Sequence, residues 1–134
     1  MIVVDTSAVV AILLEEPEGH LYLQRIAEAA SCCMSVGNAL ELSIVVLRRS
    51  GQSALATLDT FIQAQGIRLV PVDEKQLTAA REAYVSFGKG RHPAALNFGD
   101  CFGYALAKAL DAPLLFKGTD FRLTDVKVVQ VGAA

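Results

Sequence analysis

Short apolar runs alternate with longer helical stretches along this chain, and this alternation limits the fold more than any other feature of the sequence. The predicted strands cover residues 2–4 (Ile-Val-Val), 31–35, 67–72 and 113–116, and the first of them is typical of a buried parallel strand. Strands that alternate with helices build a parallel sheet with helices on both faces. We therefore expect an α/β fold of three α/β/α layers around a short, mainly parallel sheet of four or five strands.

The predicted helices fill the stretches between the strands, and a length of 134 residues fits a single domain over residues 1–134. One long loop is expected from Gly88 to Asn97, and a turn over residues 117–125. Val128, Val129 and Val131 are the candidates for a fifth strand at the sheet edge. The helices are expected over about residues 7–16, 17–30, 36–49, 52–65, 73–87 and 98–110.

Composition excludes several classes of protein. A chain that is 53% hydrophobic and only 19% charged is too apolar to be disordered. No segment reaches the roughly 18 uninterrupted apolar residues that a membrane helix needs, and the first residues do not resemble a signal peptide. The three cysteines suggest neither a disulfide framework nor a zinc site. We expect a soluble, reduced, cytoplasmic protein with no membrane partner.

The balance of charge also limits the kind of partner. With 12 basic and 14 acidic side chains the formal net charge is -2, which argues against a protein held on nucleic acid by a broad basic surface. A nucleic-acid partner would therefore need another source of attraction.

Three carboxylates stand alone in segments that are otherwise apolar. Asp5, Glu41 and Asp100 have no Lys or Arg close by in sequence. Burying an isolated carboxylate costs roughly several kcal/mol of folding free energy unless the group is paired, hydrogen-bonded, neutralised or bound to a cation. These three positions are therefore the candidates for a functional site.

The predicted topology brings these carboxylates together. Asp5 follows the first strand, and Glu41 and Asp100 lie near the starts of helices that face the same sheet edge, as does Asp120 after the fourth strand. Oxygen ligands without His or Cys select a hard cation, Mg²⁺ or Mn²⁺. A cation held there suits phosphodiester hydrolysis, with one or two ions.

Structural explanations compete with this interpretation. Asp5 and Asp100 stand where a carboxylate can cap a helix or complement its dipole, and Asp120 near Lys117 and Arg122 fits a solvated turn. Glu41 has no capping role in the middle of its apolar helix. The convergence of the set favours a site.

Residues across nearly the whole chain resemble the PIN-domain ribonucleases, and specifically the VapC toxins of type II toxin–antitoxin modules. The resemblance begins with the Met-Ile-Val-Val-Asp-Thr-Ser-Ala start, continues through Ser35 and residues 38–41, and is strongest over residues 88–107. It closes with residues 113–121 and Thr124-Asp-Val. It implies a PIN-like fold, a Mg²⁺- or Mn²⁺-dependent endoribonuclease, a homodimer and a VapB-type antitoxin that neutralises the toxin.

Carried over by position, the resemblance makes Asp5, Glu41 and Asp100 the acidic cluster, with Asp5 and Asp100 as direct metal ligands. Asp120 matches a fourth acidic position that varies across the family. Thr6 and Thr119 would position carboxylates or water.

RNA contact requires local positive charge, which Lys89 and Arg91 provide in the loop before Asp100. The expected association surfaces, for a second copy or the antitoxin, lie on the helices around residues 7–30 and 36–65. Two alternatives stay open, a catalytically degenerate PIN domain that only binds its partners and a metal-dependent phosphatase. No phosphate-binding GxxxxGK[ST] loop is present, and Asp5-Thr6-Ser7 lacks the second Asp expected of a haloacid-dehalogenase-like phosphotransferase.

Overall fold

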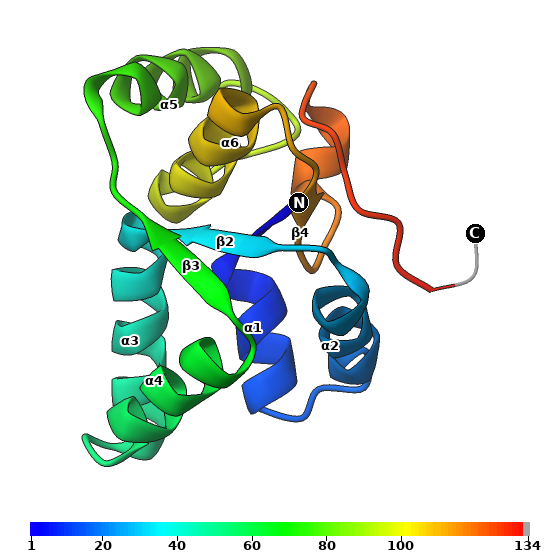
Figure 1. The fold of residues 1–134 in the computed structure, drawn as a ribbon. Helices are drawn as coiled ribbons and strands as arrows, with labels where there is room; N and C mark the ends of the chain where they lie inside the picture. The colour runs from blue at the N-terminus through cyan, green and yellow to red at the C-terminus, as the bar shows by residue number, and fades with distance from the viewer. Residues whose placement is uncertain (133–134) are drawn as a thin grey trace.

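The computed structural model describes residues 1–132, and Figure 1 shows its arrangement. Four short strands alternate with six α-helices, and a 3₁₀ turn, η1, follows the last strand. In chain order the elements are β1 (Ile2–Val4), α1 (Thr6–Leu13), α2 (Gly19–Glu28), β2 (Cys32–Ser35), α3 (Val36–Ser50), α4 (Ala54–Ala64), β3 (Ile67–Val70), α5 (Glu74–Phe87), α6 (Phe98–Leu110), β4 (Leu114–Leu115) and η1 (Asp120–Leu123).

The four strands form one parallel sheet in the order β3-β2-β1-β4. Val3 of the central strand pairs with Cys33 on one side and with Leu114 on the other. Helices α5 and α6 cover one face of the sheet, and α1 to α4 cover the other (Figure 1). The expected three-layer α/β/α architecture is confirmed.

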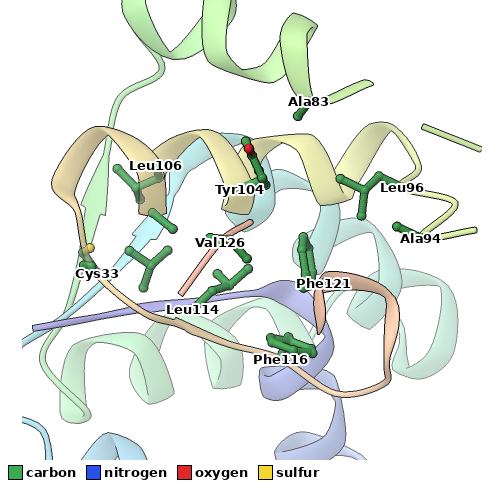
Figure 2. Close-up of a cluster of buried hydrophobic side chains, with 13 residues drawn as sticks. Cys33, Ala83, Ala94, Leu96, Tyr104, Leu106, Leu114, Phe116, Phe121 and Val126 are labelled. Atoms are coloured by element: carbon green, nitrogen blue, oxygen red, sulfur yellow. The ribbon is translucent and has the colours of Figure 1, made fainter. Parts of the chain in front are cut away.

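Two apolar cores hold the layers together, one on each face of the sheet. On one face, Val3 and Leu114 pack with Leu106 and Tyr104 of α6 and with Phe121 of η1, as Figure 2 shows for the labelled members of this cluster. The opposite core takes the alternate strand residues, such as Val4 and Met34, with side chains from α1 to α4. Successive strand residues therefore face opposite helical layers, and both faces of the sheet are buried.

Side-chain caps fix where several helices begin. Asp5, Ser35, Asp73 and Asn97 each accept a hydrogen bond from a backbone N–H in the first turn of the helix that follows. At the other end of α3, Gly51 has a φ of 83°, a left-handed conformation that a glycine adopts without strain.

Several predicted elements differ in the structure: α2, α4 and β4 are shorter at both ends than expected, and two further differences have a local cause. Helix α1 ends at Leu13 rather than near residue 16, because Glu15 takes a φ of 53° and the chain turns there. Strand β3 ends at Val70 because Pro71 has no N–H to continue the ladder. The fifth strand reduces to a single parallel bridge between Leu114 and Val128, so the sheet has four strands within residues 1–132.

The order of the strands creates one point at which the chain changes direction across the sheet. From β1 the chain moves to β2 and β3 on one side, and it then returns to place β4 on the other side of β1. Ligand sites of parallel sheets lie beyond the strand ends at such a switch point. Asp5 directly follows β1 there, and Asp120 lies in the segment that follows β4.

The structure contains no membrane-spanning candidate in the part of the chain that it describes, since none of the helices within residues 1–132 is both long and apolar enough.

Candidate functional site

Asp5 combines two roles in its two carboxylate oxygens. Oδ2 caps α1, accepting hydrogen bonds from the Ser7 N–H at 3.0 Å and from the Ser7 hydroxyl at 2.6 Å. Oδ1 is buried and has no hydrogen-bond partner, although the residue is only 3% exposed. A cap alone explains one oxygen, and the other remains available to a ligand.

Asp100 shows the same division at the start of α6. Its Oδ2 accepts from the Asn97 N–H at 3.0 Å, and Asn97 Oδ1 accepts from the Asp100 N–H at 2.9 Å. This reciprocal pair is a capping box. The capping explanation from sequence is therefore correct for both aspartates, and in each of them it accounts for only one oxygen.

Glu41 reaches this region from α3 because α6 comes unusually close. A Cβ built on Gly99 would lie closer than 3.0 Å to three atoms, all of them in the Glu41 carboxylate. The Glu41 carboxylate therefore lies directly against the backbone of the first turn of α6. Its Oε1 accepts a hydrogen bond of 3.2 Å from the side-chain amide of Asn38, one turn earlier on α3.

Burial and repulsion from neighbouring carboxylates disfavour ionisation of Asp5 and Asp100. Burial raises the pKa of Asp5 from 3.8 to about 7, the hydrogen bonds from Ser7 oppose the shift, and the charges of Asp100 and Glu41 add to it. Burial likewise raises the pKa of Asp100 to about 6, with further increases from Asp120 and Glu41. The four predicted carboxylates thus lie close enough to interact, and a cation would relieve the repulsion.

We expect the metal-free protein to lose stability as the pH rises from about 4 to about 7. In this window the folded Asp5, with its pKa of about 7, keeps a proton that the unfolded carboxyl has released at its ordinary pKa of 3.8. Stability falls with pH wherever the folded state binds more protons. Thermal unfolding in chelator across this range measures the effect. Asp5→Asn is expected to flatten it, and equal slopes for both proteins would contradict the assignment.

Apart from Thr6, which is buried, the other candidates from the sequence lie at the surface. Asp120 and Thr119 are exposed at the start of η1, and the Thr119 side chain caps nothing there. Lys89 and Arg91 are exposed in the loop before α6, where the Arg91 guanidinium donates to the Val85 carbonyl at 3.1 Å. Lys117 pairs with two glutamates of the α1–α2 connection, Glu16 and Glu18.

Sequence reasoning missed Ser7 and Asn38, and the structure gives Thr6 a partner other than the expected carboxylate. The Thr6 hydroxyl donates to the Asn38 carbonyl at 3.2 Å, whereas the neighbouring Ser7 binds the Asp5 carboxylate. Ser7 Oγ also accepts from the Lys117 N–H at 2.9 Å, which ties α1 to the segment after β4. Asn38, fully buried, was not singled out. The one available signal was a polar residue in the apolar segment three positions before Glu41.

The donor set fits a hard divalent cation that keeps part of its hydration. Within residues 1–132, no three acidic, histidine or cysteine side chains lie close enough to enclose a metal ion by themselves. Mg²⁺ does not require such a cage, because it keeps several waters and binds through one or two carboxylates. The unpartnered buried oxygen of Asp5, beside carboxylates that repel one another, suits this mode of binding.

Comparisons with known proteins identify the family of the chain. The family model of the PIN domain matches residues 2–127. A protein named Ribonuclease VapC from Mycolicibacterium smegmatis is 50% identical over 127 residues, covering 95% of this chain and 98% of that protein.

Solved structures share the fold at lower sequence identity. The crystal structure of Mycobacterium tuberculosis VapC20, described as a Sarcin-Ricin loop cleaving toxin, superposes with a TM-score of 0.77 at 19% identity, covering 97% of this chain and 99% of that one. VapBC2 from Rickettsia felis, bound to a DNA fragment from its promoter, gives a TM-score of 0.75 at 18% identity and covers 98% of this chain and 100% of that one. The near full-length family match and the close relative lead to one conclusion: this chain belongs to the PIN-domain family, among the VapC proteins.

Proposed function

We propose that this chain is a single-domain, Mg²⁺- or Mn²⁺-dependent endoribonuclease that acts as the toxin of a type II toxin–antitoxin module. One observation carries the proposal: a relative named Ribonuclease VapC matches almost the whole chain at 50% identity. The interacting carboxylates at the switch point of the sheet support it, because their chemistry suits phosphodiester hydrolysis. A toxin that cuts RNA acts where its substrate is, so we also place it in the cytoplasm.

Asp5 and Asp100 are the residues that we assign to the cation, because each keeps one carboxylate oxygen outside its capping hydrogen bonds. Glu41 and Asp120 complete the acidic set, whose charges make the local electrostatic potential more negative. A bound divalent cation would supply charge stabilisation on the scissile phosphate and a more acidic water. Thr119 stays a proposed positioning residue for water, whereas Ser7 takes the role at the Asp5 carboxylate that was expected of Thr6.

In our proposal, RNA reaches the acidic residues of the site by way of the loop before α6. Lys89 and Arg91 are both exposed in that loop, which leads through Asn97 directly into the helix that carries Asp100. Once the four site carboxylates are set aside, the 12 basic side chains outnumber the remaining acidic ones. Local positive charge is therefore available for phosphate contacts although the chain as a whole is acidic.

Incubation of the purified protein with RNA in Mg²⁺, in Mn²⁺ and in chelator tests the proposal. We expect internal cuts with either metal and none in chelator. RNA that is bound but never cut would support the degenerate binding module instead. Release of inorganic phosphate from a small monoester, without internal cuts in RNA, would support the phosphatase.

A VapB-type antitoxin is the protein partner that we propose. Among the structural neighbours, the Rickettsia felis VapBC2 assembly carries such a partner in its name. Co-expression with the product of a small upstream reading frame, followed by the RNA cleavage assay, tests this partner. Loss of cleavage in the complex is the expected result.

A homodimer is the assembly that the exposed apolar side chains favour. They gather on α3, on α5 and at the start of α6. Leu40 of α3 is 63% exposed, and Phe98, the first residue of α6, is 78% exposed. Phe98 stands between two apolar cavities, of about 420 and about 300 Å³. Within residues 1–132, α1 and α2 contribute no large exposed apolar side chain. The expected association surface on residues 36–65 is therefore supported for α3, and it extends to α5 and α6 rather than to residues 7–30.

Leu40→Glu is expected to convert the dimer into a monomer. A two-fold interface repeats each side chain, so the substitution places two charges in an apolar contact. Size-exclusion chromatography with light scattering measures the mass. Leu123→Glu is the matched control, since Leu123 is 52% exposed but belongs to η1. A monomeric wild type, or a dimeric Leu40→Glu protein, would contradict this assembly.

A further inference from the structure

Asn38 is a fully buried polar side chain that contacts one of the carboxylates. It lies in the first turn of α3 with 0% of its surface exposed. Its amide nitrogen donates to Glu41 Oε1 at 3.2 Å and to the Gly99 carbonyl at 2.9 Å. One amide group therefore holds the Glu41 side chain and the first turn of α6 at the same time.

The backbone of Asn38 makes a third connection. Its carbonyl oxygen accepts from the Thr6 hydroxyl at 3.2 Å, in the first residue of α1. Asn38, which belongs to α3, thus also contacts α1 and α6. Asp5 directly precedes α1, and Glu41 and Asp100 lie within the first two turns of α3 and α6. Within residues 1–132, no other residue joins these three helices through side-chain hydrogen bonds.

The second atom of the Asn38 amide faces the site without a partner. Oδ1 is buried and accepts no hydrogen bond, as is true of Asp5 Oδ1. A Cβ built on Gly103 of α6 would lie 3.2 Å from the Asp5 oxygen and 3.3 Å from the Asn38 oxygen. Both unpaired oxygens therefore border the same small space, which the missing side chain of Gly103 leaves open. Two buried acceptors without donors are costly unless a cation or a hydrogen-bonded water lies between them.

We propose that Asn38 is a positioning residue of the nuclease site, whose nitrogen holds Glu41 against α6 and whose Oδ1 adds a neutral oxygen beside Asp5 for the hydrated cation. This inference rests on the proposed function, and it assigns to Asn38 a role in the site beyond packing. A neutral amide adds an oxygen donor without adding to the charge repulsion that already burdens Asp5.

Asn38→Ala tests the proposal through Mn²⁺ binding, measured by calorimetry, and through steady-state RNA cleavage. We expect the Mn²⁺ Kd to rise about tenfold or more and kcat to fall about ten- to hundredfold, as is typical when a residue that orients a metal ligand is removed. KM for RNA is expected to stay unchanged because Asn38, with 0% of its surface exposed, is not accessible to RNA. If Asn38→Ala does not fold, Asn38→Ser carries the same expectation, since its hydroxyl is too short to bridge Glu41 and Gly99.

Gln76→Ala is the matched control. Gln76 is also a buried amide, 4% exposed with an unpartnered Oε1, but it lies on α5 and donates to the Pro71 carbonyl. Gln76→Ala is expected to lower the melting temperature as Asn38→Ala does, and to leave the Mn²⁺ Kd and kcat unchanged. Asn38→Ala behaving like Gln76→Ala would overturn the inference and leave the proposed function intact.

A double-mutant cycle with Glu41→Ala separates the two roles of the amide. If the amide nitrogen acts on kcat through Glu41, the loss in kcat for the double variant is smaller than the sum of the two single losses, and the part that exceeds the loss of Glu41→Ala alone belongs to Oδ1. Fully additive losses would overturn the positioning role. A wild-type protein that neither binds Mn²⁺ nor cuts RNA would instead defeat the proposed function itself.

Discussion

Asp5→Asn is expected to reduce RNA cleavage by at least about a thousandfold, the scale of losing a main electrostatic contributor in a buried site. The variant should remain folded, because asparagine is as good a helix cap as aspartate and can still accept from the Ser7 N–H. Its melting temperature in chelator at neutral pH should exceed that of the wild type, since a carboxylate that is costly to ionise has been removed. Mn²⁺ titration, RNA cleavage and thermal unfolding measure the three effects.

Asp73→Asn is the matched control for this experiment. Asp73 is also a helix cap, accepting from the Gln76 N–H at 2.9 Å, but it precedes α5 rather than α1. The control is expected to cut RNA at the wild-type rate. Wild-type cleavage by Asp5→Asn as well would show that Asp5 only caps its helix, and the proposed function would lose its main residue.

Gly99→Ala is expected to lower RNA cleavage about a hundredfold and to change stability by at most about 1 kcal/mol, because the methyl group meets only the end of the flexible Glu41 side chain. The added methyl group would lie far closer than 3.0 Å to Glu41 Oε2, inside any permitted contact, so either α6 or the Glu41 side chain must move. Either movement separates the carboxylates of α3 and α6. Cleavage kinetics and chemical denaturation measure the two effects.

The Glu41→Ala background isolates the cause of this effect. The three atoms nearest to the added methyl group all belong to Glu41, so removing that side chain removes the clash. In this background Gly99→Ala should stabilise the fold, because the better helix propensity of alanine adds up to about 1 kcal/mol. Destabilisation in the absence of the Glu41 side chain would show that some other contact requires Gly99.

The fold could be predicted from sequence because its determinants are local. Strand runs such as residues 2–4 and caps such as Asp73 and Asn97 act over a few residues, and the structure confirms the helices that follow them. Of the expected four or five strands the described residues form four, and the candidate fifth is a single bridge at Val128, because pairing at a sheet edge depends on tertiary contacts that a short apolar run does not specify. Helix α6 matches its expected bounds, since Asn97 caps it and Asp111 ends it in a left-handed conformation.

The charged residues of the candidate site could be predicted from the sequence, whereas its neutral residues could not. A lone carboxylate in an apolar segment is visible in sequence because burying it is costly, and Asp5, Glu41 and Asp100 do interact. The contact of Asn38 with Gly99 joins residues 61 positions apart, and no local pattern indicates it. Sequence also could not choose between two adjacent hydroxyls at the start of α1, where the second rather than the first binds the carboxylate.

The different bonding of the two carboxylate oxygens in Asp5 and in Asp100 limits which substitutions such a protein can accept during evolution. In each residue one carboxylate oxygen takes part in capping a helix, and the other is not needed for the cap. A lineage that abandons RNA cutting but keeps the fold can therefore discard the charge more easily than the cap. We expect inactive descendants to carry Asn, Ser or Thr at position 5, rather than an apolar residue. The same substitutions would retain an antitoxin-binding scaffold without a toxic activity.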